Sequence, residues 1–211
     1  MNTFGRKDLR CCLDRLEYIA KREAELTFYS NKSKMEREAW VVRNFVDILG
    51  LSFNEDEITP GRDEPIDVEF RGGEFQIKEL MDDGRRRMDE VRVELARVRA
   101  LKDDEINTLS SFEPDFVSTS KLIERVLPRM EQAIARYGGG QNCDLLYYAN
   151  YSSVFTTERE ATQFRVKIPP TLMMWRSVSV VTGKTASVLH ADAKAPLFLR
   201  DALGLVYTNR V

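Results

Sequence analysis

The sequence predicts an α/β protein in which a mixed central β-sheet is flanked by helices on both sides, with further helices at the N-terminus. Apolar residues recur at helical spacing in four segments, residues 9–26, 33–49, 85–102 and 118–137. Shorter runs with strand character lie at residues 65–78, 144–149 and 175–189. Strand–helix–strand order requires crossover connections, which bring parallel strands together and place helices against the sheet.

Composition limits the class of protein. The chain has 211 residues, 43% apolar and 31% charged, which suits one domain over residues 1–211 with a helical extension at 1–32. No apolar run reaches about 18 residues, so we expect no membrane span. Residues 1–10 lack the apolar region of a secretion signal, and three cysteines make no disulfide framework, so we expect a cytoplasmic location.

The second predicted helix carries a carboxylate on its apolar stripe. Ser33 is a candidate N-cap, and Gly50 is a candidate C′ residue after the helix. Glu38 lies in phase with Val42 and Phe45, where an unpaired carboxylate would be costly to bury. Glu38 therefore needs a partner, unless it is a partly exposed residue at the edge of the stripe.

Residues 65–78 read as a β-hairpin. The predicted turn is Gly72-Gly73, because glycine accepts the positive φ angles of a tight hairpin turn. This turn would set Asp67 opposite Lys78. Alternation along the strands gives one apolar face, made of Val68, Phe70, Phe75 and Ile77. The other face is polar and carries Asp67, Glu69, Gln76 and Lys78.

The polar face fits either a surface ribbon or a metal site. Phosphodiester hydrolysis uses a divalent cation to neutralise developing charge and to lower the pKa of the attacking water. Hard cations such as Mg²⁺ and Mn²⁺ take oxygen ligands. Asp67 would supply a carboxylate, with the Gln76 amide oxygen and the Ile77 carbonyl as further ligands. Lys78 would orient the water or stabilise the phosphate.

The second half of the chain supplies the remaining elements. Pro128 should kink or split the helix at 118–137, and Gly138-Gly139-Gly140 should end it. Residues 144–149 suit a buried strand. A second hairpin follows, with strands at 175–181 and 186–189, and residues 197–203 form a helical turn. The single histidine, His190, is expected to be a strand residue and not a catalyst.

The hairpin resembles the PD-(D/E)XK nuclease superfamily, which has the restriction-endonuclease-like fold. Pro65 and Asp67 match its Pro-Asp pair, and Gln76-Ile77-Lys78 matches (D/E)-X-K. The chain departs twice: one extra residue separates Pro65 from Asp67, and glutamine replaces the acid. Glu69 or Glu74 could supply the missing charge. Further segments resemble a small, uncharacterised bacterial family described as endonucleases of that fold, at residues 36–41, 83–86, 175–180 and 195–200.

The resemblance implies a set of site residues and a substrate. The catalytic residues would be Asp67, Gln76, Lys78 and Glu38, and the ligands of Mg²⁺ or Mn²⁺ would be Asp67, Gln76 and Ile77. The substrate would be nucleic acid, DNA in the first place, and the protein could act as a homodimer. Between residues 85 and 102 there are seven basic residues against three acidic ones. Nucleic acid would contact Arg85, Arg86, Arg87 and Arg92. A solvated helix with wet arginines explains the same charge run equally well.

Three functional interpretations stay open. The first is a metal-dependent nuclease that hydrolyses phosphodiester bonds, and the retained Asp67 and Lys78 favour it. The second is a catalytically inactive member of the same fold that binds nucleic acid or protein, and Gln76 favours that. The third is an unrelated α/β interaction protein whose hairpin face is a cross-strand ion pair contributing about 0.2–1 kcal/mol.

Overall fold

The structure, a computed structural model, describes residues 15–100, 114–137, 142–151, 154–157, 162–164 and 166–209. The predicted terminator Gly138–Gly140 lies outside these residues. The chain divides into two compact units, residues 1–34 with 84–111, and residues 35–83 with 112–211. Across the described ranges, no helix has both the length and the apolar character needed to cross a membrane.

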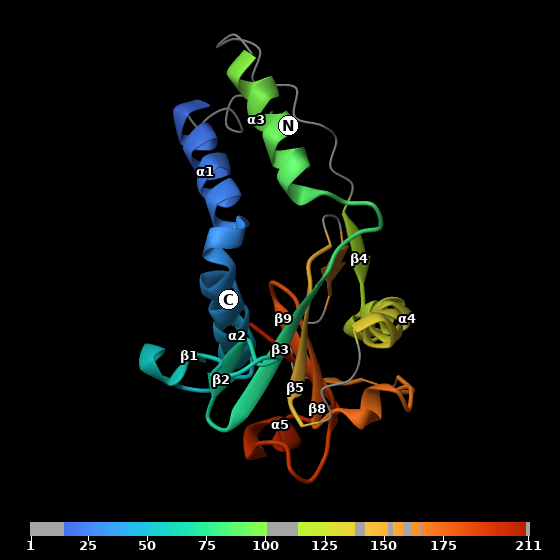
Figure 1. Cartoon of the computed structure of the whole chain (residues 1–211). Coiled ribbons are helices and arrows are strands. Elements are labelled where there is room, and N and C mark those ends of the chain that lie inside the picture. The colour runs from blue at the N-terminus through green and yellow to red at the C-terminus, as the bar shows by residue number, and fades with distance from the viewer. Residues whose placement is uncertain are drawn as a thin grey trace, which may run out of the picture. The chain divides into compact units, whose positions relative to one another are not determined.

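The smaller unit is a pair of helices, α1 (Arg15–Phe28) and α3 (Arg87–Ala100), which lie side by side (Figure 1). A short 3-10 turn, η2 (Asn31–Ser33), follows α1. As predicted, α3 buries three apolar side chains, Val91, Leu95 and Val98. Tyr18 of α1 donates a hydrogen bond to Glu94 of α3 over 3.1 Å.

The larger unit contains the predicted mixed sheet, with the strand order β1-β2-β3-β5-β8-β9-β10-β7 in the described residues. The first four strands in chain order are β1 (Thr59–Pro60), β2 (Val68–Phe70), β3 (Gly73–Leu80) and β5 (Asp144–Ala149). The other four are β7 (Thr162–Gln163), β8 (Ser177–Val181), β9 (Thr185–Ala191) and β10 (Leu205–Thr208). The strands β3, β5 and β8 are parallel and form the centre of the sheet.

A second, two-stranded sheet joins β4 (Asp115–Val117) to β6 (Val154–Thr156) in parallel. Short helical segments complete the unit: η3 (Glu55–Glu57), η4 (Leu172–Met174) and α5 (Leu197–Asp201). The predicted hairpin at 175–189 corresponds to β8 and β9, joined through Thr182, Gly183 and Lys184.

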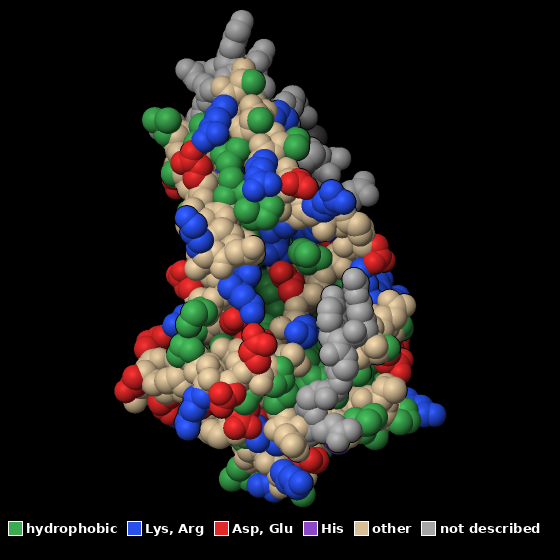
Figure 2. Space-filling view, in the orientation of Figure 1, with side chains coloured by type: hydrophobic (Ala, Val, Ile, Leu, Met, Phe, Trp, Pro, Cys, Tyr) green, Lys and Arg blue, Asp and Glu red, His purple; other side chains and the backbone are tan. Residues whose placement is uncertain are grey.

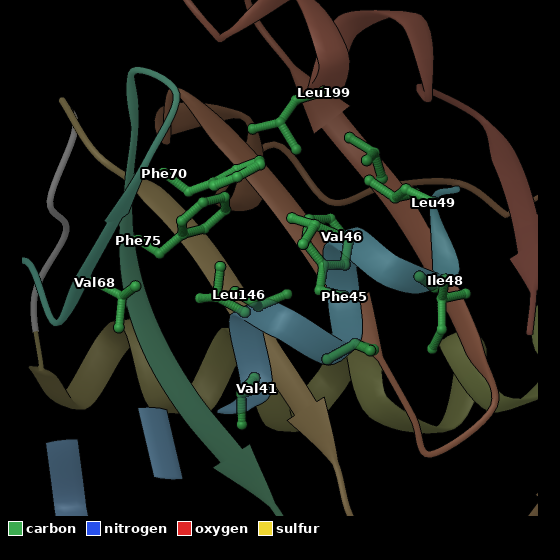
Figure 3. Close-up of a cluster of buried hydrophobic side chains, with 14 of the residues drawn as sticks. Val41, Phe45, Val46, Ile48, Leu49, Val68, Phe70, Phe75, Leu146 and Leu199 are labelled. Atoms are coloured by element: carbon green, nitrogen blue, oxygen red, sulfur yellow. The ribbon is translucent and has the colours of Figure 1, made fainter. Parts of the chain in front are cut away.

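Helices cover both faces of the main sheet, as the sequence predicted. On one face α2 (Lys34–Ile48) buries Phe45 and Val46 against Phe70, Phe75 and Leu146 (Figure 3). On the other face, a second core gathers α4 (Thr119–Tyr137) around strand residues that include Leu145, Tyr147 and Val178. Gly50 ends α2 with a positive φ of 76°, as predicted. The helix α4 continues through Pro128, so the predicted split is wrong.

The β2–β3 hairpin has a different register from the predicted one. Its turn is Arg71-Gly72, with φ angles of 46° and 79°, so both central residues are left-handed as in a type I′ turn. Val68 therefore pairs with Phe75, and the Asp67 amide also donates to the Phe75 carbonyl, so Asp67 does not lie opposite Lys78 as predicted. The shift is two residues, and the side-chain period of a strand is two, so the side chains within β2 and β3 keep their predicted faces.

Gly73 belongs to β3, where it pairs with Phe70 and lacks room for a side chain. A Cβ atom there would lie 2.8 Å from the Phe75 ring and 2.9 Å from the Phe70 carbonyl oxygen. The carbonyl belongs to the ladder and cannot move away easily. The second glycine of the pair is therefore a packing requirement of the strand, which explains why the turn lies one residue earlier.

Gly73→Ala should lower the free energy of unfolding by about 1–3 kcal/mol, the usual cost of forcing an extra methyl group into a packed site. Gly183→Ala is the matched control, because its Cβ would have no atom within 4 Å and its φ is not left-handed. Urea denaturation measures both. Equal stability of the two variants would contradict the close packing at Gly73.

Candidate functional site

Asp67 is fixed against the backbone of β3. Its amide donates to the Phe75 carbonyl over 2.8 Å, and its Oδ2 accepts the Ile77 amide over 2.8 Å. The carboxylate thus lies beside the middle residue of the Gln76-Ile77-Lys78 segment. A strand residue directs its N–H and its C=O to the same neighbour. The Ile77 carbonyl therefore points to the side of β3 on which Asp67 lies.

Gln76 and Lys78 point to the face of the sheet that α4 covers. Both line a cavity of about 10 Å³, together with Ala133 and Ile134 of α4 and Tyr147 of β5. Such a volume holds about one water molecule. Both side chains are half-buried, as Asp67 is. A hydrated cation would therefore need the more open side of Asp67, where the β2–β3 pairing ends at Val68 and Phe75.

Glu38 lies on α2, whose core covers the opposite face of the sheet from Gln76 and Lys78. The structure therefore brings Gln76 and Lys78 onto one face, holds Asp67 against the edge of β3 through the Ile77 amide, and places Glu38, which is half-buried, on the helix across the sheet. In the part of the chain that is described, no group of three or more His, Cys, Asp or Glu side chains is arranged to hold a metal ion. The predicted ligand set contains one such side chain, Asp67, with an amide and a carbonyl oxygen.

The two acids that could compensate for Gln76 are both held by arginines. Glu69 and Glu74 face each other across the hairpin, one pair closer to the turn than Val68 and Phe75. Glu69 forms an ion pair with Arg62 over 3.2 Å, and Glu74 forms one with Arg176 over 3.2 Å. Their charges are thus directed to these partners and not to the Asp67 carboxylate.

The predicted nucleic-acid contacts lie on and just before α3, in the smaller unit. Arg85 pairs with Glu90 over 2.9 Å and Arg92 pairs with Asp89 over 3.2 Å. Arg87 is buried, with its guanidinium 3.8 Å from the centre of the Tyr29 ring. Arg86 is exposed. Further along α3, Arg97 and Arg99 also form ion pairs, with Glu94 and Glu23. Acidic neighbours therefore neutralise much of the basic run.

A buried ionic cluster, which the sequence interpretation missed, fixes the amino end of the central strands. Asp144 is fully buried, and its Oδ1 accepts hydrogen bonds from Ser177 Oγ at 2.7 Å and from Arg176 Nε at 3.1 Å. Its Oδ2 accepts the Glu74 amide at 2.9 Å and the Arg176 Nη2 group. Arg176 also donates to the Gly72 carbonyl at 3.2 Å. One carboxylate thus joins β3, β5, β8 and the hairpin turn.

Titratable groups near this cluster are unsuited to catalysis at neutral pH. Burial, reinforced by the neighbouring Asp144 charge, raises the pKa of the Cys143 thiol to about 11. The thiol therefore stays protonated and is a poor nucleophile. Burial also raises the pKa of Tyr147, whose hydroxyl donates to the Met130 carbonyl over 3.2 Å.

Arg129 of α4 fixes the segment that leaves β3. Its guanidinium donates to the Met81 carbonyl, pairs with Asp83, and donates to the Tyr151 hydroxyl over 3.2 Å. This residue and the Asp144 cluster hold β3 at its two ends. Gln76 and Lys78 therefore lie on a strand whose two ends are anchored, and Asp67 is bonded to that strand. A reactive site requires such rigidity.

Comparisons with known proteins place the chain in a family. A family model described as "Putative endonuclease, protein of unknown function (DUF1780)" matches residues 13–211. A solved structure of a protein of unknown function from Pseudomonas aeruginosa strain PAO1, described as belonging to the monooxygenase superfamily, is 22% identical. The superposition covers 93% of this chain and 96% of that protein's chain, with a TM-score of 0.56, so the two proteins share a fold. No curated protein matches the chain.

Proposed function

We propose, since the chain belongs to the DUF1780 family, that it is a metal-dependent nuclease that hydrolyses phosphodiester bonds, DNA being its first expected substrate. The observation that carries the proposal is the hydrogen bond from the Ile77 amide to Asp67 Oδ2. It holds a carboxylate beside the Gln76-Ile77-Lys78 segment.

The donor atoms at Asp67 suit a hard cation. Mg²⁺ takes one or two carboxylates and fills its remaining positions with water and phosphate oxygens, so a single carboxylate with two neutral oxygens suffices for weak binding. Asp67 and the Ile77 carbonyl would hold the ion, and Gln76 would serve as the third ligand after turning out of the small cavity that it lines under α4. When bound, a divalent cation would neutralise charge on the phosphate and lower the pKa of a water molecule.

Lys78 has the role of a point charge beside the phosphate. Its ammonium group can donate to a non-bridging phosphate oxygen, where negative charge grows in the transition state, or hold the attacking water. Asp67 keeps its orientation through the Ile77 amide and needs no rearrangement during the reaction. Gln76 precedes Ile77, whose amide holds Asp67, and can contribute an oxygen or orient a water molecule.

The neutral side chain of Gln76 favours one alternative, a catalytically inactive member of the fold that binds nucleic acid or a protein. The ion pairs of Glu69 and Glu74 with arginines also favour this alternative, because neither carboxylate is directed to Asp67. Arg85 and Arg92 form ion pairs with acidic neighbours, which argues against α3 as the surface that binds nucleic acid. Exposed Arg86 is the residue of that predicted set best suited to test it.

A cleavage assay tests the proposal. The wild-type protein should cut plasmid DNA, single-stranded DNA or RNA in the presence of Mn²⁺ or Mg²⁺, and a chelator should abolish the cut. Lys78→Met should lower the cleavage rate by about 100-fold, the usual effect of removing one donor to a developing oxyanion. Lys194→Met is the matched control, because Lys194 is an exposed lysine in the turn before α5.

Two results would decide against the nuclease. Cleavage that survives the chelator, or that falls equally in Lys78→Met and Lys194→Met, would mean that this face does not carry the reaction. If no substrate is cut with either metal but DNA is retained, the binding module becomes the better description. In that case Arg86→Ala should reduce DNA retention while Lys78→Met leaves it unchanged.

A further inference from the structure

A cavity opens where the central parallel strands end. Its volume is about 260 Å³, and it lies at the carboxyl ends of β5 and β8, with walls that include Asn150, Tyr151, Phe155, Thr182 and Lys184. In open α/β sheets, ligands commonly bind outside the carboxyl ends of the strands. Its volume is just below the range of about 300–1,000 Å³ of small-molecule sites, so it suits a ligand the size of one nucleotide.

One wall of the cavity is aromatic and continues onto the surface. Phe155 of β6 lines the cavity and pairs in register with Phe116 of β4. The two ring centres lie 5.9 Å apart with the planes tilted by 42°. Phe116 is 65% exposed and Phe155 is 37% exposed. Exposing two large rings side by side is costly in water, and such a pair provides flat apolar surface on which a base can stack.

Other residues of the cavity wall are polar or basic. Asn150 lies at the end of β5, where its side-chain amide donates to Glu79 over 2.8 Å. Lys184 lies in the β8–β9 turn, whose shape is fixed by the hydrogen bond from the Lys184 amide to Thr182 Oγ1 over 3.1 Å. The Lys184 side chain is exposed and makes no ion pair with the residues that the structure describes. An ammonium held this way is available to a phosphate.

We propose that this cavity binds an unpaired nucleotide of a single-stranded nucleic acid. The base stacks on Phe155, with the tilted Phe116 ring extending the apolar surface beside it, Asn150 lines the same cavity, and Lys184 binds a flanking phosphate. A paired base is stacked within its duplex and cannot insert its face between these walls, so the cavity selects single-stranded substrate. The inference rests on the proposed function for the identity of the substrate, and it adds the class of nucleic acid.

The location of the cavity relative to Lys78 supports this assignment. Lys78 of β3 pairs with Tyr147 of β5, and the cavity wall begins one residue further along β5, at Tyr148. Neighbouring strands are about 4.8 Å apart and each residue advances about 3.3 Å, so Lys78 lies roughly 10 Å from the cavity wall at Asn150. That distance corresponds to about one or two nucleotides of a nucleic acid. One nucleotide can therefore occupy the cavity while the sugar-phosphate backbone of the same molecule passes Lys78.

The charge distribution on the other side of β3 favours a nucleic acid that runs from Lys78 toward the cavity. Beyond β3 lie β2 and β1, and the segment around them carries exposed acids, Glu55, Asp56, Asp63 and Glu64. Figure 2 shows acidic side chains gathered at the lower left, over this segment. Phosphates are repelled there. A nucleic acid strand would therefore leave Lys78 toward β5 and β8.

The test is binding of a labelled oligothymidylate of about 12 nucleotides, measured by fluorescence anisotropy with a chelator present to prevent cleavage. Phe155→Leu keeps an apolar side chain without the flat ring, and it should weaken binding about 5- to 100-fold, the range found for loss of one stacked base. Lys184→Ala should weaken binding and lower the salt dependence, with the slope of log K against log salt reduced by about 0.7.

Controls separate this inference from the proposed function. Met174→Ala and Lys194→Ala remove an exposed apolar and an exposed basic side chain elsewhere, and both should bind as the wild type does. An oligouridylate tests RNA against DNA, and a duplex of the same length should bind more weakly. Asp67→Asn should retain full binding even if it cuts nothing. Binding that is unchanged in Phe155→Leu, or no preference for single strands, would overturn the inference, whatever the cleavage assay shows.

Discussion

Asp144→Ala should lower the free energy of unfolding by about 3–5 kcal/mol, the usual cost of removing one partner from a buried ion pair. The carboxylate is fully buried and accepts hydrogen bonds from Arg176, Ser177 and the Glu74 amide. Without it, the Arg176 guanidinium loses its principal buried partner. Burying an unpaired charge is far more costly than losing the attraction alone.

Urea denaturation measures the effect, which corresponds to a fall in melting temperature of about 10 °C for a chain of this size. Glu55→Ala is the matched control, because the Arg43–Glu55 pair spans 2.5 Å but Glu55 is 72% exposed. An exposed pair contributes about 0–1 kcal/mol. If the two variants lost equal stability, the Asp144 cluster would not be holding the strands together.

A double variant distinguishes charge from packing. Asp144→Ala combined with Arg176→Met removes both charges, so it should recover part of the stability that Asp144→Ala loses. Recovery is expected to be incomplete, because Arg176 also donates to the Gly72 carbonyl and pairs with Glu74. If the double variant loses as much stability as Asp144→Ala and Arg176→Met lose together, the two side chains do not interact.

The fold was predictable where local pattern and long-range packing agree. Helical spacing identified α2 and α4, and the apolar run at 144–149 gave the bounds of β5 as the structure has them. The split expected at Pro128 does not occur, because α4 is held by the core around Val126 and Met130. Tertiary packing outweighed the local penalty.

The site was predictable in its faces but not in its register. Alternation placed Gln76 and Lys78 on one face of β3, and a shift of two residues leaves such a prediction intact. Which residues stand opposite each other depends on the turn, and that depended on the space around Gly73, a tertiary contact with Phe70 and Phe75. Periodicity carries no information about such a contact.

The Asp144 cluster could not be inferred from one sequence, although a signal was present. Asp144 begins an apolar strand, and a charged residue at the edge of a buried run needs a partner. That partner is Arg176, 32 positions later, and only the parallel pairing of β5 with β8 brings the two together. The pairing of α3 with α1 was hidden for the same reason, since no local pattern in either helix identifies its neighbour.

Asp67→Asn should abolish metal-dependent cleavage, with a loss of about 1,000-fold or more. Asparagine keeps the size of the side chain and can still accept the Ile77 amide, but it removes the single carboxylate of the proposed ligand set. Metal assistance supplies several kcal/mol of transition-state stabilisation, and each 1.36 kcal/mol is a factor of ten in rate. Cleavage assays measure the loss, and calorimetry with Mn²⁺ should show that the heat of binding disappears.

Gln76→Glu is the matched opposite change, because it adds a carboxylate next to Ile77, whose amide holds Asp67, without altering length or shape. A second charge should tighten Mn²⁺ binding by about tenfold or more, since ligand charge is what sets the affinity of hard cations. An active wild type predicts that Asp67→Asn lowers cleavage and that Gln76→Glu preserves or raises it. If Gln76→Glu gains metal binding and cleavage while the wild type has neither, the glutamine is the change that silenced the site. If neither variant alters metal binding, the hairpin face carries no cation, and the binding module is left as the function of this chain.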